Sequence, residues 1–168
     1  PIQTIRNQIF RTNLNEVVTF IVDNIFRRTS TESDAFKINC ELEQNLPVVN
    51  VNEFVVWEIV EPLIQNSIDH GSESGLEITV QTIHDESMKC SRLVIKDNGK
   101  GIDADLLETN AKGQKKIFIE NTTTKSQGLR NSGYGCYIAW EMTRRCGWEL
   151  DAENLPEKGC IFTITIKH

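Results

Sequence analysis

The sequence predicts an α+β domain with two layers, in which helices pack on one face of a mixed, mostly antiparallel sheet. Two patterns lead to this prediction. Apolar residues recur at the spacing of an amphipathic helix in some segments and alternate with polar residues in others. The alternating segments mostly lie close enough in sequence to form hairpins, with helices between them. A chain of 168 residues is long enough for one such domain with its own core.

Composition narrows the class of protein. Apolar residues make up 39% of the chain and charged residues 25%, which is ordinary for a globular domain. The formal net charge of −6 argues against a general nucleic-acid binder, because such proteins need clustered Lys and Arg. The sequence has no signal peptide and no apolar run long enough to cross a membrane. We therefore expect a cytoplasmic domain. Because the chain opens on Pro1, the cytoplasmic end of a larger membrane protein stays an open interpretation.

The five cysteines are an odd number, and no pair has the spacing of a zinc or redox motif. Cysteine also packs well as a small apolar residue. We expect free, mostly buried thiols in a reducing compartment. They are Cys40, Cys90, Cys136, Cys146 and Cys160.

The first elements are helical by pattern. Ile2, Ile5 and Ile9 recur at helical spacing, so residues 1–12 are expected to be the last turns of a longer helix, or a linker. Asn13 begins a capping box, which predicts that a new helix starts there. The compact domain then follows from residue 13. The apolar face of the new helix consists of Leu14, Val17, Val18, Ile21 and Ile25.

A strand, a long helix and two more strands are expected next. Residues 36–42 alternate between apolar and polar, as in a strand with one buried face. A helix is predicted over residues 52–69, with an asparagine cap at its start and a glycine after its end. Pro62 lies inside this helix, removes a backbone donor and is expected to kink it. The two strands are predicted at residues 76–80 and 93–96.

The C-terminal part begins with an unusual segment. Residues 101–132 are polar and long, with little to bury, which is typical of a functional loop or a mobile lid. A helix is predicted over residues 133–147, where it meets a glycine. Residues 148–152 and 160–167 should form a final hairpin.

Residues whose side chains could bind a ligand or a metal ion are concentrated in four short stretches. In "IQNSIDHG", Asn66, Asp69 and His70 are spaced to share one helical face. An amide oxygen, a carboxylate and an imidazole on one face can hold hydrated Mg²⁺ and contact phosphate. The alternative is a polar, solvated helix end.

The stretch "DNGKGI" places Asp97 at the end of a predicted strand, followed by two glycines. A carboxylate there can accept the exocyclic amine of a purine, and glycine lets a ring approach the backbone closely. An ordinary hairpin turn is the alternative. The other stretches are "IFIENTTTK", with Phe118 and Lys125, and "NSGYGC", whose glycines open a helix, where backbone NH groups bind phosphate.

Together, in this order and spacing, the four stretches resemble the N, G1, F and G2 boxes of the GHKL (Bergerat) ATP-binding fold. Sensor histidine kinases, gyrase-type topoisomerases, heat-shock chaperone ATPases and mismatch-repair proteins share this fold. The resemblance covers about residues 14–168. The segments "LEQNLPVVNVNEFVVWEIVEPLIQNSIDHG" and "IFIENTTTK" look most like the catalytic domain of a sensor histidine kinase.

The resemblance implies a set of site residues for ATP and Mg²⁺. Asn66 would bind Mg²⁺ and phosphate, and Asp97 would bind the adenine amine. The resemblance favours His70 over Asp69 as a phosphate contact, because Asp69 stands where many kinases have a cation. Asn131 departs from the usual first glycine of the last box, although asparagine tolerates positive φ. The remaining implied contacts are Gly99, Gly101 and Ile102 at the adenine pocket, Lys125 in the lid, and Gly133, Tyr134 and Gly135 at the phosphates.

Phosphoryl transfer is expected rather than hydrolysis. In the hydrolytic branches a glutamate one helical turn before the asparagine activates water, and here that position is Pro62. Glu61 and Glu58 are poorly placed to replace it, because they lie off the asparagine's face or too far along the helix. Transfer would then depend on positioning and charge neutralisation.

The acceptor is expected to be a histidine outside this chain, because none of the three histidines lies in a helix like a phosphoacceptor box. Residues 1–12 would then be the tail of a dimerisation helix. The implied partners are the phosphoacceptor domain of the same homodimeric kinase and a response regulator. Two alternatives remain: a serine kinase of the anti-sigma type, and a degenerate nucleotide-binding scaffold without transferase activity.

Overall fold

The computed structural model describes residues 5–27, 36–71, 74–119 and 134–168, and its core is one mixed sheet with strand order β1-β2-β3-β5-β4. β1 runs parallel to β2, and every other neighbouring pair is antiparallel. The predicted mixed, mostly antiparallel sheet is therefore confirmed. The strands are β1 (Phe36–Glu41), β2 (Leu76–Asp85), β3 (Cys90–Asp97), β4 (Glu149–Asn154) and β5 (Cys160–Lys167).

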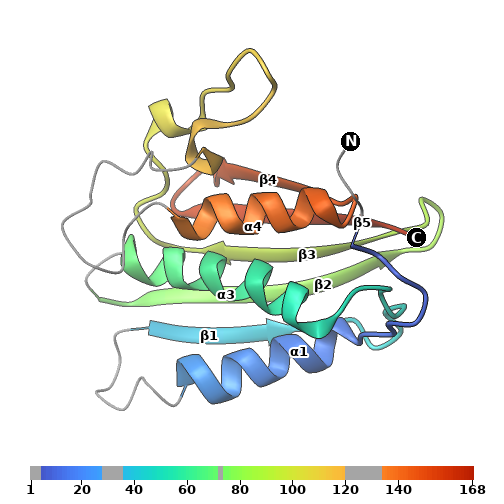
Figure 1. Ribbon diagram of the computed structural model, residues 1–168. Coiled ribbons are helices and arrows are strands. Elements are labelled where there is room, and N and C mark those ends of the chain that lie inside the picture. Colours follow the sequence, from blue (N-terminus) through green and yellow to red (C-terminus); the bar gives the residue numbers. More distant parts are fainter. Residues whose placement is uncertain (1–4, 28–35, 72–73, 120–133) are drawn as a thin grey trace.

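Helices cover one face of this sheet (Figure 1). The side chains of β5 alternate between buried and half-buried positions, as expected when only one face is covered. Most of the buried apolar side chains lie between the two layers, which confirms the predicted two-layer sandwich. The helical elements are α1 (Leu14–Ile21), its π-helical continuation η1 (Val22–Phe26), α3 (Glu53–Asp69), the 3-10 turns η2 (Ala104–Leu107) and η3 (Lys116–Phe118), and α4 (Tyr134–Arg145).

Both predicted asparagine caps are confirmed. The Asn13 side chain accepts a hydrogen bond from the backbone NH of Glu16 at 3.1 Å, and the Asn52 side chain accepts one from Phe54 at 2.9 Å. These bonds satisfy backbone donors that the first turn of a helix leaves free. They fix where α1 and α3 begin.

Residues 5–12 are not helical, so the predicted last turns of a helix are wrong for this part of the segment. The backbone NH of Ile5 donates to the carbonyl of Arg145 at the end of α4. Thr12 forms an antiparallel bridge with Val49, with both N–O distances at 2.9 Å. These long-range bonds replace the bonds that a helix would make. The expected role of the segment as a linker stays a prediction.

The two central strands are longer than predicted. They form a hairpin in which Ile78 lies opposite Asp97 and Asp85 lies opposite Cys90. The sequence pattern missed residues 81–85 and 90–92. Backbone hydrogen bonds extend both strands there, and such bonds do not depend on alternating apolar side chains. The final hairpin, β4 with β5, is confirmed.

Cations contact the two edge strands of the sheet. At one edge, the Arg27 guanidinium donates to the carbonyl of Ile38 in β1 at 2.8 Å. At the other edge, the Lys115 ammonium donates to the carbonyl of Ala152 in β4 at 2.6 Å, and it pairs with the Asp151 carboxylate at 2.8 Å. Lys115 thereby fastens the segment before η3 to β4.

Candidate functional site

Four elements end or begin at the same side of the molecule. The C-terminal ends of α3 and β3 lie there with the N-terminal ends of α4 and β5 (Figure 1). This arrangement brings together two of the predicted stretches, the end of the asparagine helix and the segment after Asp97. We call residues 97–102 the purine wall, after the contact that the resemblance implies for them.

Asp97 is the best-defined predicted site residue. It is 6% exposed. Its Oδ1 atom accepts a hydrogen bond from the backbone NH of Gly99 at 2.8 Å, and Cys160 Sγ lies 3.2 Å from Oδ2 as a donor. A buried carboxyl group is costly unless donors surround it. The fold therefore holds this acid in a fixed orientation at the end of β3.

Both predicted glycines of the purine wall are required by the local geometry. A Cβ on Gly99 would lie 3.0 Å from Asp97 Oδ1 and 3.1 Å from the Cα of Gly71, at the end of α3. Gly101 has φ +85°, and its Cβ would lie 2.9 Å from Asn154 Oδ1. The wall does not turn into a hairpin, because the next strand along the chain is β4. The hairpin alternative is therefore wrong.

Ile102, the last residue of the purine wall, is held by β4. The Asn154 side chain accepts from the Ile102 NH at 2.7 Å and donates to the Ile102 carbonyl at 2.8 Å. Sequence reasoning missed both Asn154 and Cys160, because each is distant in sequence from the motif that it contacts. Their sequence signal is only their place beside the turn of the final hairpin. Asn154 comes just before this turn, and Cys160 directly follows Gly159 at its end.

The predicted metal and phosphate residues lie at the end of α3. Asn66 and His70 are half-buried, and His70 is the C-terminal cap of the helix. The Asp69 carboxylate accepts a hydrogen bond from Gln65 at 2.9 Å, so a neighbour on its own helix already occupies it. Ser67, which sequence reasoning did not select, is 2% exposed, and its Oγ has no hydrogen-bond partner among the described residues.

The acid nearest to the expected general-base position points elsewhere. The carboxylate of Glu61 accepts a hydrogen bond from the indole NH of Trp57, which lies one turn earlier on α3. Pro62 follows Glu61, and the Cβ of Pro62 would lie 3.3 Å from a Cβ added to Gly135. Gly135 therefore lets α4 pack closely on α3. This packing is a structural reason for the glycine, beside its predicted phosphate contact.

Several predicted residues of the lid and last box lie outside the described residues: Lys125, Asn131 and Gly133. Tyr134 is the first residue of α4. Phe118, just before this region, is 1% exposed and stacks on Trp140 of α4 at a centroid distance of 5.1 Å. The aromatic residue of the third stretch therefore packs in the core, where it anchors η3 to α4.

The free thiols are confirmed for all five cysteines, and all except the half-buried Cys40 are buried. Burial raises the pKa of Cys136 and Cys146 to about 12. Burial, followed by the neighbouring Asp97 charge, also raises the pKa of Cys160. The Cys160 thiol is therefore protonated, as a hydrogen-bond donor to Asp97 must be.

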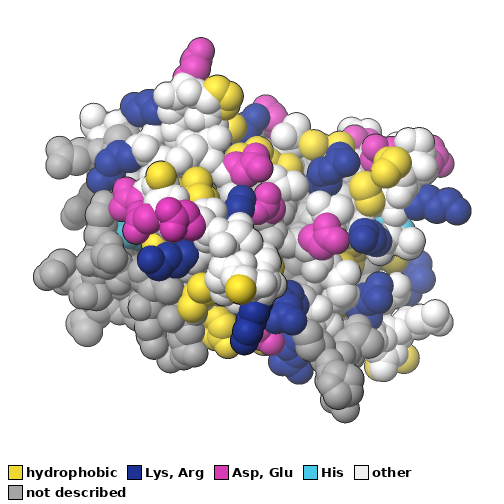
Figure 2. Space-filling view, turned by 90° about the horizontal axis from the view of Figure 1, so that it is seen from above, with side chains coloured by type: hydrophobic (Ala, Val, Ile, Leu, Met, Phe, Trp, Pro, Cys, Tyr) yellow, Lys and Arg dark blue, Asp and Glu magenta, His cyan; other side chains and the backbone are white. Residues whose placement is uncertain are grey.

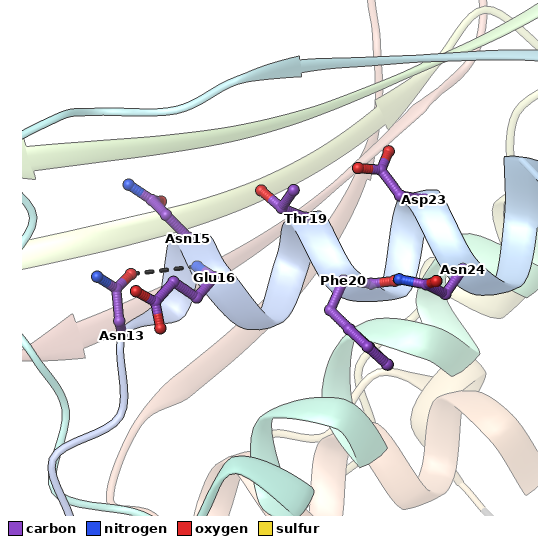
Figure 3. Close-up of a pocket in the computed structure, with 7 residues that line it drawn as sticks. All are labelled: Asn13, Asn15, Glu16, Thr19, Phe20, Asp23 and Asn24. Carbon is purple, nitrogen blue, oxygen red and sulfur yellow. Dashed lines mark hydrogen bonds between the residues drawn. The ribbon is translucent and has the colours of Figure 1, made fainter.

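The surface has two further features. A hollow of about 420 Å³ lies along α1 and η1, where Phe20 points toward α3 (Figure 3). Its lining residues, Asn13, Asn15, Glu16, Thr19, Phe20, Asp23 and Asn24, include none of the predicted site residues. On another face, Lys and Arg side chains are interspersed with Asp and Glu (Figure 2).

No helix in the described part of the chain is both long and apolar enough to span a membrane.

The mixed five-stranded sheet with helices on one face defines an α+β domain of the Bergerat type. The profile of the family described as histidine kinase-, DNA gyrase B-, and HSP90-like ATPase matches residues 52–168, which is more than half of the chain. The chain belongs to this family.

Similar curated proteins carry sensor-kinase names. The chain is 25% identical to the sensor protein TdiS of Thauera aromatica, over 92% of this chain and 26% of TdiS. It is also 25% identical to the adaptive-response sensory kinase SasA of Crocosphaera subtropica, over 79% of this chain and 32% of SasA. The chain thus spans less than a third of the length of either relative.

Solved structures confirm the predicted fold. The catalytic domain of histidine kinase ThkA has a TM-score of 0.75 at 21% identity, with 94% of each chain covered. The mycobacterial sensor histidine kinase MprB has a TM-score of 0.72 at 17% identity, over 94% of this chain and 95% of that chain. At these identities the likeness shows the fold alone.

Proposed function

We propose that this chain is the ATP-binding catalytic domain of a two-component sensor histidine kinase. It binds ATP with Mg²⁺ and transfers the γ-phosphoryl group to a histidine on a dimerisation domain outside the chain. The family match and the names of the relatives support the class. The observation that carries the proposal is the buried, donor-held carboxyl group of Asp97 against a glycine-lined wall.

The described residues fit a nucleotide. Gly99 and Gly71 let the segment after β3 approach the end of α3 closely, because an added Cβ on either glycine would clash there. The buried Ser67 Oγ, one helical turn before Gly71, has no hydrogen-bond partner among the described residues. We assign the adenine amine to Asp97, and Mg²⁺ with phosphate oxygens to Asn66, since Mg²⁺ prefers oxygen ligands. His70 is assigned to phosphate rather than Asp69, because an imidazole NH can donate to a phosphate oxygen and an ionised carboxylate cannot.

ATP supplies the phosphoryl group, and the chain's own residues bind and orient it. Glu61, the acid nearest to the expected base position, is bonded to Trp57. The proposed site therefore works by positioning and charge neutralisation, and the acceptor brings its own nucleophile. The chain alone should turn ATP over slowly.

Binding of ATP tests the assigned pocket. In isothermal titration with ATP and Mg²⁺, Asp97→Asn should weaken affinity by about tenfold or more, because the amide turns a donor toward the adenine amine. Asp105→Asn, which changes an exposed acid in η2, is the matched control and should bind like the wild type. Equal affinity of Asp97→Asn and the wild type would contradict the assignment.

Transfer tests the activity and separates the alternatives. We expect the chain, incubated with labelled ATP and a separately produced dimerisation domain that carries the acceptor histidine, to yield acid-labile phosphate on that domain. Acid-stable phosphate would favour the serine-kinase alternative. ATP binding without any transfer to the cognate domain would favour the scaffold alternative.

The partners follow from the same proposal. The relatives are sensor kinases of greater length, so the chain is proposed to be one domain of such a protein. We assign it a dimerisation and phosphoacceptor domain, a homodimeric full-length state, a downstream response regulator and a cytoplasmic location, the last because ATP is the substrate.

A further inference from the structure

The final hairpin contacts both ends of the purine wall. Asn154, the last residue of β4, bonds to both backbone polar groups of Ile102, at 2.7 and 2.8 Å. Cys160, the first residue of β5, donates to Asp97 Oδ2 at 3.2 Å. The two contacts come from either side of one turn and bind the last and first residues of the wall.

The Asn154 contact fixes a backbone that would otherwise have freedom. Gly101, directly before Ile102, adopts φ +85°, a conformation that glycine enters and leaves at little cost. The side-chain amide of Asn154 accepts from the NH of Ile102 and donates to its carbonyl, as the backbone of a neighbouring strand would do in a sheet. It therefore limits the positions available to the outer end of the wall.

The Cys160 contact fixes the carboxyl group itself. Oδ1 of Asp97 is taken by the Gly99 NH, and the thiol hydrogen bond restrains Oδ2. Burial and the Asp97 charge raise the pKa of Cys160, so the sulfur stays a donor at neutral pH. With both oxygens restrained, the carboxyl plane cannot rotate without breaking a bond.

We propose that Asn154 and Cys160 are positioning residues that make the site prefer adenine to guanine. Adenine presents an amine donor where guanine presents a carbonyl acceptor, so a rigidly aimed carboxylate favours adenine and repels guanine. A carboxylate free to rotate discriminates less. This inference rests on the proposed ATP-binding function of the same site.

The test measures the affinity of the 168-residue chain for ATP and for GTP, each with Mg²⁺, by isothermal titration. Cys160→Ala and Asn154→Ala should each weaken ATP binding by about three- to tenfold and lower the ratio of ATP to GTP affinity by a similar factor. Cys160→Ser, which keeps a donor, should restore the wild-type ratio.

Matched controls separate positioning from a general loss of structure. Cys90→Ala removes a buried thiol at the opposite end of β3, and Asn13→Ala removes a side chain that accepts a backbone hydrogen bond at the start of α1, outside the proposed site. Both should leave the affinity ratio unchanged. If Asn154→Ala does not fold, Asn154→Asp, which loses the donor to the Ile102 carbonyl, should still lower the ratio.

The outcomes are distinct. An unchanged ratio in either alanine variant, or an equal loss of ATP and GTP affinity, overturns the positioning role of that residue. Failure of the wild type to bind ATP overturns the proposed function, and this inference with it, before any substitution is compared.

Discussion

At the scale of single residues, a close approach between strands depends on Gly159. An added Cβ there would lie 1.8 Å from the backbone oxygen of Asp97, and the residue has φ +92°. Gly113 has φ +80°, but nothing lies within 4 Å of its added Cβ. The two glycines therefore share a conformation and differ in their surroundings.

This difference predicts unequal costs of substitution. Gly113→Ala should lower the free energy of unfolding by about 1 to 2 kcal/mol, the cost of positive φ alone. Gly159→Ala should cost more than about 4 kcal/mol or prevent folding, because the β3 backbone cannot move aside. Urea denaturation of both variants measures this, and equal losses would contradict the described contact.

The local pattern of an acid followed by glycines at a strand end drew attention to Asp97, Gly99 and Gly101, and the resemblance assigned them to the adenine pocket. Neither could single out Cys160 or Asn154, whose contacts with these residues exist only because β5 pairs with β3 and β4 follows it in the sheet. Long-range pairing of this kind leaves no periodic trace in the sequence.

At the scale of elements, sequence patterns predicted helices and strands correctly where neighbouring residues alone decide the structure. Asn13 and Asn52 cap helices through bonds to residues two or three positions away, so their sequence signals were sufficient. The final hairpin was equally clear from alternation. Residues 5–12 show the limit, because Ile5 and Thr12 bond to distant backbone groups that the isolated segment does not reveal.

The apolar spacing of that segment was also misleading. Ile5 packs against the core, whereas Ile9 is 78% exposed. A helical stripe would have buried both on one side. Phe118, the aromatic residue of the third stretch, packs in the core beside Trp140, a contact that the motif alone does not reveal.

At the scale of the whole molecule, the buried thiols couple stability to pH. Burial raises the pKa of Cys136 from 9.0 to about 12. Between these values the unfolded chain releases the proton and the folded chain keeps it, so the unfolded state binds fewer protons and stability falls as pH rises. Cys146 and Cys160 shift in the same direction.

We therefore expect the urea midpoint to decrease between about pH 8 and about pH 10.5. Cys136→Ala should show a smaller decrease than the wild type, because it no longer has a thiol that titrates only in the unfolded chain. The comparison removes the contribution of lysines and tyrosines, which both proteins share. An identical pH dependence of the two midpoints would contradict a strongly raised pKa at Cys136.

The cations at the two edges of the sheet have a consequence for association. An edge strand with free carbonyls can recruit a strand from another molecule and begin an aggregate. Here Arg27 occupies a carbonyl of β1 and Lys115 occupies one of β4. A second copy would have to displace a charged side chain at either margin before it could continue the hydrogen-bonded ladder, which disfavours polymerisation through the sheet.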